Sequence, residues 1–166
     1  IGMSIIPEGK CTFPVRVITS YEPTGIVGNV FKLLRLAERM KKEGLEPSES
    51  SIERLVVGGE SFAEEARNYL SEVWDCDVYN TYGSTEGTMC GECSAINGLH
   101  VPEDLVHLDV YDPRMNEFVD DGECGRIVLT TLLPVGAKCG TLLLNYDTED
   151  TTVVRTRDKC SCGRTH

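Results

Sequence analysis

Two patterns of apolar residues occupy the first quarter of the chain. Residues 13–19 alternate apolar and polar side chains and end before a turn, which predicts a strand, since successive strand side chains point to opposite faces. From Thr24 to about Glu43, apolar side chains recur every three or four positions, which predicts a long helix capped by Thr24. Gly44 follows and predicts the end of that helix.

A second strand, a second helix and a third strand come next. Residues 55–57 form a short apolar run that predicts a buried strand. The next helix is expected to start after Ser61, which forms a capping box with Glu64, and to have Phe62 on its buried face. Residues 77–79 predict the third strand. Because strands and helices alternate at short spacings, we expect a βαβαβ run that forms a parallel sheet with right-handed crossovers.

The pattern changes after residue 100, where strand-like segments follow one another without a helix between them. Pro, Gly and Asp turns separate these segments, which are residues 105–111, 125–132, 141–145 and 151–155. The predicted fold class is therefore α/β. We expect residues 1–100 to form a βαβαβ parallel-sheet part that carries the binding loops, and residues 101–166 to form an antiparallel β meander of the same domain.

Composition and charge exclude several classes of function. The chain has 166 residues, and 16 basic against 27 acidic residues give it a net charge of −11. A nucleic-acid-binding protein needs positive charge against the phosphates, so we expect no such partner. No apolar run approaches the roughly 18 residues that cross a bilayer, and the N-terminus has no signal-peptide pattern, so we expect no membrane and a cytoplasmic location.

The chain has eight cysteines, and they divide into two kinds. Cys11, Cys76, Cys124 and Cys139 stand alone and are expected to be small core residues. The other four form a C-x-x-C and a C-x-C. The core expected from the helices and strands makes a disulfide-stapled fold unnecessary.

The paired cysteines offer ligands for a structural metal. Cys93, His100, Cys160 and Cys162 would supply the three thiolates and one imidazole of a tetrahedral Zn²⁺ site. Cys90 competes with Cys93 for one place, because a C-x-x-C can supply both sulfurs. Two alternatives stay open: the four are reduced surface thiols, or Cys90 and Cys93 form a redox pair.

Two loops are expected at the carboxyl ends of the parallel strands, where open sheets bind their ligands. Gly58-Gly59-Glu60 lets a flat ligand lie close to the backbone. In residues 80–87, the Tyr82 ring can stack on a base, hydroxyls can donate to phosphate, and Glu86 can ligate Mg²⁺. Alone, each loop is weak evidence, because paired glycines at a strand end are more often only a turn and Ser-Thr-Glu is more often only a helix cap.

Together these segments resemble the adenylate-forming enzymes. Residues 82–87 (YGSTEG) resemble the Y-G-x-T-E signature of that superfamily, and residues 145–150 (NYDTED) resemble its later Y-x-T-x-D signature. Gly58-Gly59-Glu60 resembles the glycine turn that precedes both. Residues 98–104 and 160–166 are typical of the phenylacetate–CoA ligases and of archaeal relatives that adenylylate a deazaflavin coenzyme. In that branch a C-x₆-H-V pattern favours Cys93 with His100 as metal ligands.

The resemblance implies a role for each motif residue. Tyr82 would stack on adenine, Asp150 would bind the ribose hydroxyls, and Thr85 would bind the α-phosphate. Glu86 would hold Mg²⁺, which makes Thr85 and Glu86 the catalytic residues. The implied nucleotide-binding residues are Gly58, Gly59, Glu60, Tyr82, Gly83, Ser84, Thr85 and Asp150. Two positions depart from the signature, because Asp147 and Glu149 stand where the family often has Arg and Gly.

The resemblance also implies a reaction and its partners. The family joins a carboxylic acid to AMP from ATP, then transfers the acyl group to CoA, here with an aryl acid such as phenylacetate. The alternatives are AMP transfer to a deazaflavin coenzyme, or a zinc-stabilised module without catalysis. The fold would be part of a ligase's large N-terminal domain, and a homodimer is an arrangement that stays open. Without the family's upstream phosphate loop and C-terminal lid domain with its lysine, this segment alone is expected to be inactive.

Overall fold

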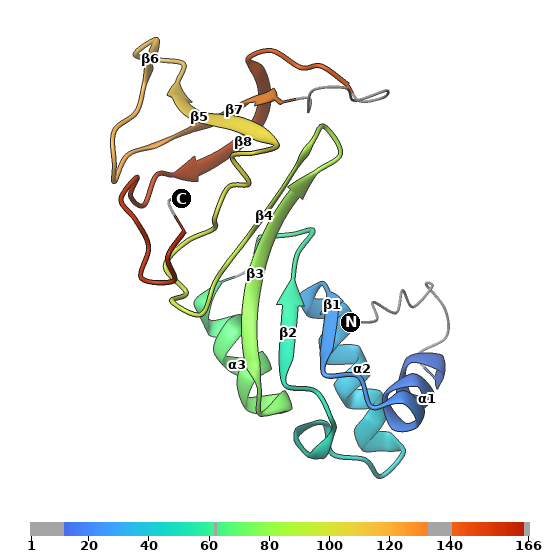
Figure 1. The fold of residues 1–166 in the computed structure, drawn as a ribbon. Coiled ribbons are helices and arrows are strands. Elements are labelled where there is room, and N and C mark those ends of the chain that lie inside the picture. The colour runs from blue at the N-terminus through green and yellow to red at the C-terminus, as the bar shows by residue number, and fades with distance from the viewer. Residues whose placement is uncertain (1–11, 62, 133–140, 165–166) are drawn as a thin grey trace. The chain divides into compact units, whose positions relative to one another are not determined.

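The computed structural model describes residues 12–61, 63–132 and 141–164 (Figure 1). By their internal contacts, the residues divide into two compact units, Ile1–Asn80 and Thr81–His166. The elements of the first unit are α1 (Thr12–Tyr21), β1 (Gly25–Gly28), α2 (Val30–Lys42), the 3₁₀ helix η1 (Pro47–Glu49), β2 (Arg54–Val57), α3 (Glu64–Trp74) and the start of β3 (Asp77–Ser84). The second unit holds the end of β3, β4 (Thr88–Gly91), β5 (Val106–Asp112), β6 (Glu117–Phe118), β7 (Cys124–Thr131) and β8 (Tyr146–Val153).

The first unit is built on three parallel strands. β2 lies between β1 and β3, and Leu55 pairs in register with Ile26 on one side and Val78 on the other. α2 connects β1 to β2, and α3 connects β2 to β3. The predicted βαβαβ order is therefore confirmed, although its first strand is β1 and not residues 13–19.

One face of this sheet carries the core of the first unit. In β2, Leu55 and Val57 are fully buried, whereas Arg54 at the start of the strand is exposed and Val56 is only partly buried. The three helices contribute to the same cluster, with Val15 from α1, Leu33 from α2 and Trp74 from α3. Burial of alternate strand residues against helix faces is what the short apolar run predicted.

The predicted strand at residues 13–19 is wrong, because these residues belong to helix α1. Val15 and Ile18 are both buried in the core cluster, and residues three apart lie on one face of a helix. The segment also satisfies an alternating pattern, so its sequence fits both periods, and packing against α2 selects the helix.

The predicted helix start at Thr24 is also wrong. Residues 25–28 form β1, and α2 begins only after Asn29, whose side-chain oxygen accepts a hydrogen bond from the Lys32 amide (2.9 Å). Pairing with β2 satisfies backbone N–H and C=O groups of residues 25–28, which the longer helix would have bonded within itself. The predicted end holds, because α2 stops at Lys42 and Gly44 takes a left-handed φ of 76°.

The second helix begins later than its capping box predicted. α3 starts at Glu64 after Ala63, which makes no side-chain capping bond. Ser61 is outside the helix, and Phe62 lies outside the described residues. The helix ends at Trp74, and the following Asp75 has a left-handed φ of 50°.

The second unit begins with a hairpin where a loop had been expected. Residues 81–84 of β3 pair antiparallel with β4, and Tyr82 lies opposite Cys90. The expectation of a loop over residues 80–87 is therefore wrong except for the turn at residues 85–87. Its polar side chains are compatible with an exposed hairpin, since Thr81 Oγ1 donates to the Cys90 carbonyl at 2.6 Å.

The other sheet of this unit is the predicted antiparallel meander, with strand order β6-β5-β7-β8. The strands expected at residues 105–111 and 125–132 correspond to β5 and β7. The two expected at 141–145 and 151–155 are replaced by one strand, β8, which bridges the supposed turn between them. β7 buries alternate residues, and Ile127 and Leu129 pack with Val106 and Val110 of β5.

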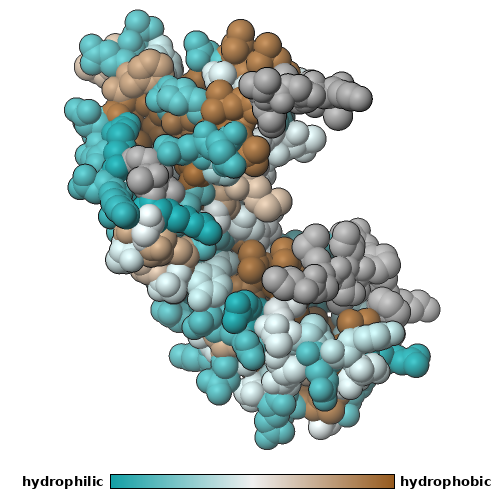
Figure 2. Space-filling view, in the orientation of Figure 1, coloured by the Kyte–Doolittle hydropathy of each residue, from teal (hydrophilic) through white to brown (hydrophobic). Residues whose placement is uncertain are grey.

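The surface adds two observations. None of the helices in the described part of the chain is long and apolar enough to cross a membrane. Exposed apolar side chains are frequent on the second unit, where they appear brown in Figure 2, and Met115, Phe118 and Leu144 are each more than 60% exposed.

Candidate functional site

The glycine turn lies at the carboxyl end of β2, as expected. The Gly58 amide donates to the Gly28 carbonyl at 3.1 Å, and Gly59 adopts a left-handed φ of 82° that favours glycine. Glu60 Oε1 accepts a hydrogen bond from the Val30 amide at 3.0 Å. The carboxylate therefore sits at the N-terminus of α2, where the helix dipole favours a negative charge.

The Y-G-x-T-E signature lies on the β3–β4 hairpin. Tyr82, Gly83 and Ser84 end β3, and the exposed Thr85 and Glu86 form its turn. The Ser84 hydroxyl is buried without a hydrogen-bond partner in the described part of the chain. The Glu86 carboxylate thus lies on a tight turn, directly after the hydroxyl residues Ser84 and Thr85 in sequence.

Gly87 closes this turn where another residue would not fit. Its φ is 144°, and a Cβ there would approach Thr131 Cγ2 of β7 to 2.8 Å. The glycine of the signature therefore lets the hairpin turn lie against β7 within the second unit.

The two signatures meet at Tyr82 and Asp150. The Tyr82 hydroxyl donates a 2.7 Å hydrogen bond to Asp150 Oδ2, although the residues are 68 positions apart. Partial burial and this bond to a carboxylate raise the pKa of Tyr82 to about 12. The residues expected to contact the base and the ribose are thus brought together in one unit.

A bulge in β8 presents Asp150. Arg126 of β7 pairs with Thr151 and Val128 pairs with Asp147, so one residue of β7 faces three of β8. Within the bulge, Thr148 Oγ1 donates to the Ile127 carbonyl (3.0 Å) and accepts from the Asp150 amide (3.2 Å).

The unexpected acidic residues of this signature have a basic partner. Arg126 Nη2 lies 2.9 Å from Asp147 Oδ2 and 3.4 Å from Glu149 Oε1. Glu149 has a left-handed φ of 64° at the position where the family often has glycine. Sequence reasoning missed Arg126, because nothing in a lone arginine 21 residues upstream signals which strand will lie beside it.

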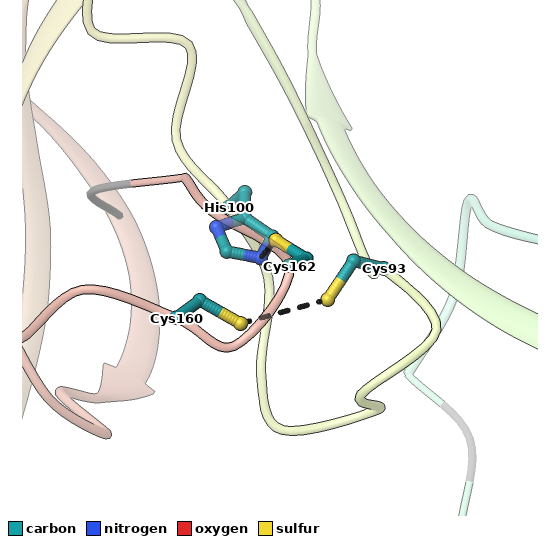
Figure 3. A group of neighbouring side chains, drawn as sticks. All are labelled: Cys93, His100, Cys160 and Cys162. Atoms are coloured by element: carbon teal, nitrogen blue, oxygen red, sulfur yellow. Dashed lines mark hydrogen bonds between the residues drawn. The ribbon is translucent and has the colours of Figure 1, made fainter.

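Three of the four paired cysteines, Cys93, Cys160 and Cys162, form a compact cluster with His100 (Figure 3). Their ligand atoms all lie within 4.8 Å of one another. Cys93 Sγ is 3.7 Å from Cys160 Sγ, and Cys162 Sγ is 3.5 Å from His100 Nε2. Zn–S bonds of about 2.3 Å and Zn–N bonds of about 2.0 Å place tetrahedral ligands about 3.8 Å apart for two sulfurs and about 3.5 Å for sulfur and nitrogen. These residues therefore fit a tetrahedral zinc ion.

Local backbone structure positions the four ligands. Cys93 follows β4, and His100 returns to pair with Gly91 through two backbone hydrogen bonds of 2.9 and 3.3 Å. Cys160 and Cys162 lie on a tight turn in which the Gly163 amide donates to the Cys160 carbonyl (2.9 Å). Two segments of the second unit, far apart in sequence, thereby meet at the cluster.

Hydrogen bonds to sulfur favour the thiolate form of two ligands. The Cys162 amide lowers the pKa of the Cys160 thiol to about 6, and the Ala95 amide and then His100 lower that of Cys93. Thiolates are the form that binds metal.

The remaining cysteines lie elsewhere. Cys90 is 3% exposed and is not among the clustered ligands. Cys76 is partly buried against the first unit's core. The expected core position of Cys124 is wrong, because Cys124 is the first residue of β7 and lies on the exposed side of its alternation. Cys11 and Cys139 lie outside the described residues, as does His166.

Comparison with known proteins places these motifs in a family. The chain is 33% identical to the phenylacetate–coenzyme A ligase of Thermus thermophilus, over 100% of this chain and 38% of that protein. It is 25% identical to the phenylacetate–coenzyme A ligase of Pseudomonas putida, over 92% of this chain and 35% of the relative. The chain thus spans less than two-fifths of the length of these relatives. No family model matches it.

Solved structures share the fold. A crystal structure of 2-hydroxyisobutyryl-CoA ligase in complex with 2-HIB-AMP and CoA superposes with a TM-score of 0.82 at 21% identity, over 97% of this chain and 38% of that one. A benzoate CoA ligase from Burkholderia xenovorans superposes with a TM-score of 0.58 at 15% identity, over 78% of this chain and 28% of that one. The predicted fold class and the predicted resemblance are both confirmed.

Proposed function

We propose that this chain, which belongs to the adenylate-forming superfamily, forms the nucleotide-binding part of an acid–CoA ligase. The reaction would join a carboxylic acid to AMP, release pyrophosphate and pass the acyl group to CoA. The observation that carries this proposal is the 2.7 Å contact between Tyr82 and Asp150, which unites the two signatures at one place. The names of the relatives favour an aryl acid such as phenylacetate.

Each signature residue has a chemical task in this proposal. The Tyr82 ring stacks on adenine, because its face is apolar and its hydroxyl is already held by Asp150. Asp150 accepts hydrogen bonds from the ribose hydroxyls with the carboxylate oxygens that Tyr82 leaves available. Within the first unit, Gly58 and the left-handed Gly59 leave the turn before Glu60 free of side chains, which lets a flat ligand lie on its backbone.

The hairpin turn would stabilise the charge that develops at the α-phosphate. The hydroxyls of Ser84 and Thr85 donate to phosphate oxygens, and the buried Ser84 hydroxyl lacks a partner among the described residues. Glu86 fits a Mg²⁺ ligand, because it is an exposed carboxylate on a rigid turn. Bound Mg²⁺ supplies Lewis-acid stabilisation of the phosphate charge.

Product identification tests this function. We expect the full gene product, incubated with ATP, Mg²⁺, CoA and a panel of acids, to form AMP and an aryl-CoA thioester, with phenylacetate among the best substrates. Glu86→Gln should lower the rate about 100-fold or more, because a ligand to the transition-state metal is lost. AMP attached to a deazaflavin coenzyme without CoA consumption would instead support the alternative reaction. If the full gene product has neither activity, the result would support the remaining hypothesis, a zinc-stabilised module without catalysis.

We also propose that Cys93, His100, Cys160 and Cys162 bind one structural Zn²⁺. The match of two ligand separations, 3.7 and 3.5 Å, to tetrahedral geometry supports this site. Four protein ligands leave no open position for water, so the ion would act on structure rather than on the reaction. It would fasten the segment after β4 to the segment after β8.

A further inference from the structure

We propose that Arg126, acting through Asp147, is a positioning residue that holds the β8 bulge and so aims the Asp150 carboxylate at the ribose. This inference rests on the proposed function, in which Asp150 binds the ribose hydroxyls. Arg126 itself touches neither nucleotide nor metal in the proposal.

Asp147 uses both carboxylate oxygens. Oδ2 lies 2.9 Å from Arg126 Nη2, and Oδ1 accepts a hydrogen bond from the Glu149 amide at 2.9 Å. The first contact ties the start of the bulge to β7, and the second fixes the left-handed turn at Glu149. Loss of the arginine would therefore free the side chain that defines the bulge.

Hydrogen bonds within the bulge also fix the position of Asp150. Thr148 is held between the Ile127 carbonyl and the Asp150 amide by hydrogen bonds of 3.0 and 3.2 Å. The Asp150 side chain that results meets the Tyr82 hydroxyl at 2.7 Å. Arg126 thus contacts Asp147, the neighbouring Thr148 bonds to the Asp150 amide, and the chain itself joins Asp147 to Thr148.

Charge gives a second reason for the arginine. Asp147, Glu149 and Asp150 place three carboxylates within four residues, beside a site proposed to bind a phosphate-bearing ligand. Arg126 pairs with two of them, which lowers their mutual repulsion. Glu149 is 85% exposed and its pair contributes little, whereas Asp147 is less exposed and closer to Arg126.

The test compares AMP with 2′,3′-dideoxy-AMP, which lacks both ribose hydroxyls, by NMR titration of the 166-residue chain. We expect wild type to bind AMP about tenfold more tightly than the dideoxy analogue, because hydrogen bonds to a carboxylate are lost with the analogue. Arg126→Gln and Asp147→Asn should reduce that ratio about threefold or more, and Arg126→Lys should restore part of it. Arg114→Gln, which removes a charge from the turn between β5 and β6, should leave the ratio unchanged.

If Arg126 had only a structural role, Arg126→Gln would lower the affinity for AMP and for the dideoxy analogue equally and preserve their ratio. That result would overturn the proposal. Asp150→Asn separates this failure from failure of the proposed function. If Asp150→Asn keeps the wild-type ratio, Asp150 does not bind ribose. If it abolishes the preference and Arg126→Gln does not change it, only the positioning role is wrong.

A second readout needs no nucleotide. The Tyr82 pKa is raised to about 12 by burial and by the bond to Asp150. Following the Tyr82 ring carbon by NMR against pH, we expect Arg126→Gln to move the midpoint toward the ordinary value of about 10. An unchanged midpoint would contradict the proposal even in a chain that binds neither nucleotide.

Discussion

Glu149 has a backbone conformation that its side chain does not favour. Its φ of 64° is left-handed, which costs a residue with a Cβ about 1 kcal/mol or more. We predict that Glu149→Gly raises the free energy of unfolding by up to about 1 kcal/mol, because the relief of strain exceeds the loss of a largely exposed ion pair. Thermal unfolding measures the change. Asn145→Gly is the matched control, since Asn tolerates its left-handed φ of 48° better. A lower melting temperature for Glu149→Gly would contradict the strain argument.

Gly87 presents the opposite case, where a side chain is excluded. We predict that Gly87→Ala destabilises the protein by about 1–3 kcal/mol, because φ is 144° and the new Cβ would lie 2.8 Å from Thr131 Cγ2. Denaturant unfolding measures this loss.

A second substitution separates the two causes at Gly87. Thr131→Ser removes the Cγ2 methyl and should recover part of the loss in a double variant, leaving the backbone strain. Gly122→Ala, at φ 88° with nothing within 4 Å of the Cβ position, carries strain alone and should cost less than Gly87→Ala. Equal costs for the two glycines would rule out the Thr131 contact.

The start of helix α2 tests the corrected element boundary. We predict that Asn29→Ala destabilises the protein by about 1 kcal/mol, because Asn29 Oδ1 caps the Lys32 amide. Thr24→Ala should cost much less, since Thr24 is an exposed residue before β1 and caps no helix. Thermal unfolding of the two variants decides between the starts; a larger loss for Thr24→Ala would favour the longer helix.

The cluster of cysteines and histidine joins two segments that share no strand pairing. If it binds zinc, we predict about one zinc ion per chain by elemental analysis, and a lower melting temperature after chelation. Cys162→Ser should reproduce both losses. The exposed Cys124→Ser is the control and should keep the metal and the melting temperature. Metal-free protein that chelators leave unchanged would show that these residues are reduced thiols.

Sequence patterns predicted the topology better than the element boundaries. The apolar run at residues 55–57 and the alternation in β7 predicted strands correctly. In both strands every second residue is buried in a core, so the order of the residues along the strand shows the burial directly. Residues 13–19 fit two periods, and only packing chose the helix. β1 is only four residues long, begins and ends with glycine, and depends on its partner β2, so its local sequence carried too weak a signal.

The candidate site was also predictable from the sequence only in part. Motifs identified Tyr82, Asp150 and the four clustered ligands, and the structure brings together Tyr82 with Asp150 and the ligands with one another. The bulge and its Arg126 partner were not predictable, because they arise from the register between β7 and β8. Register is a property of paired strands and appears in neither strand alone.

The net charge of the chain bears on its proposed ligand. At −11, long-range electrostatics oppose an anionic nucleotide, so binding must depend on local donors and on Mg²⁺. Within the second unit, one arginine offsets the acidic residues beside Asp150. The account therefore requires that the Tyr82–Asp150 site bind nucleotide by hydrogen bonding and stacking rather than by a basic surface.

The most direct test is acid-dependent exchange of labelled pyrophosphate into ATP, measured on the full gene product with and without Asp150→Asn. The account predicts exchange that requires an aryl acid and Mg²⁺, and a loss of about 100-fold in Asp150→Asn, because the ribose loses charged hydrogen bonds. Folded variant protein, checked by its melting curve, excludes simple unfolding. Undiminished exchange in Asp150→Asn, or no exchange with any acid in wild type, would contradict the proposed adenylation site.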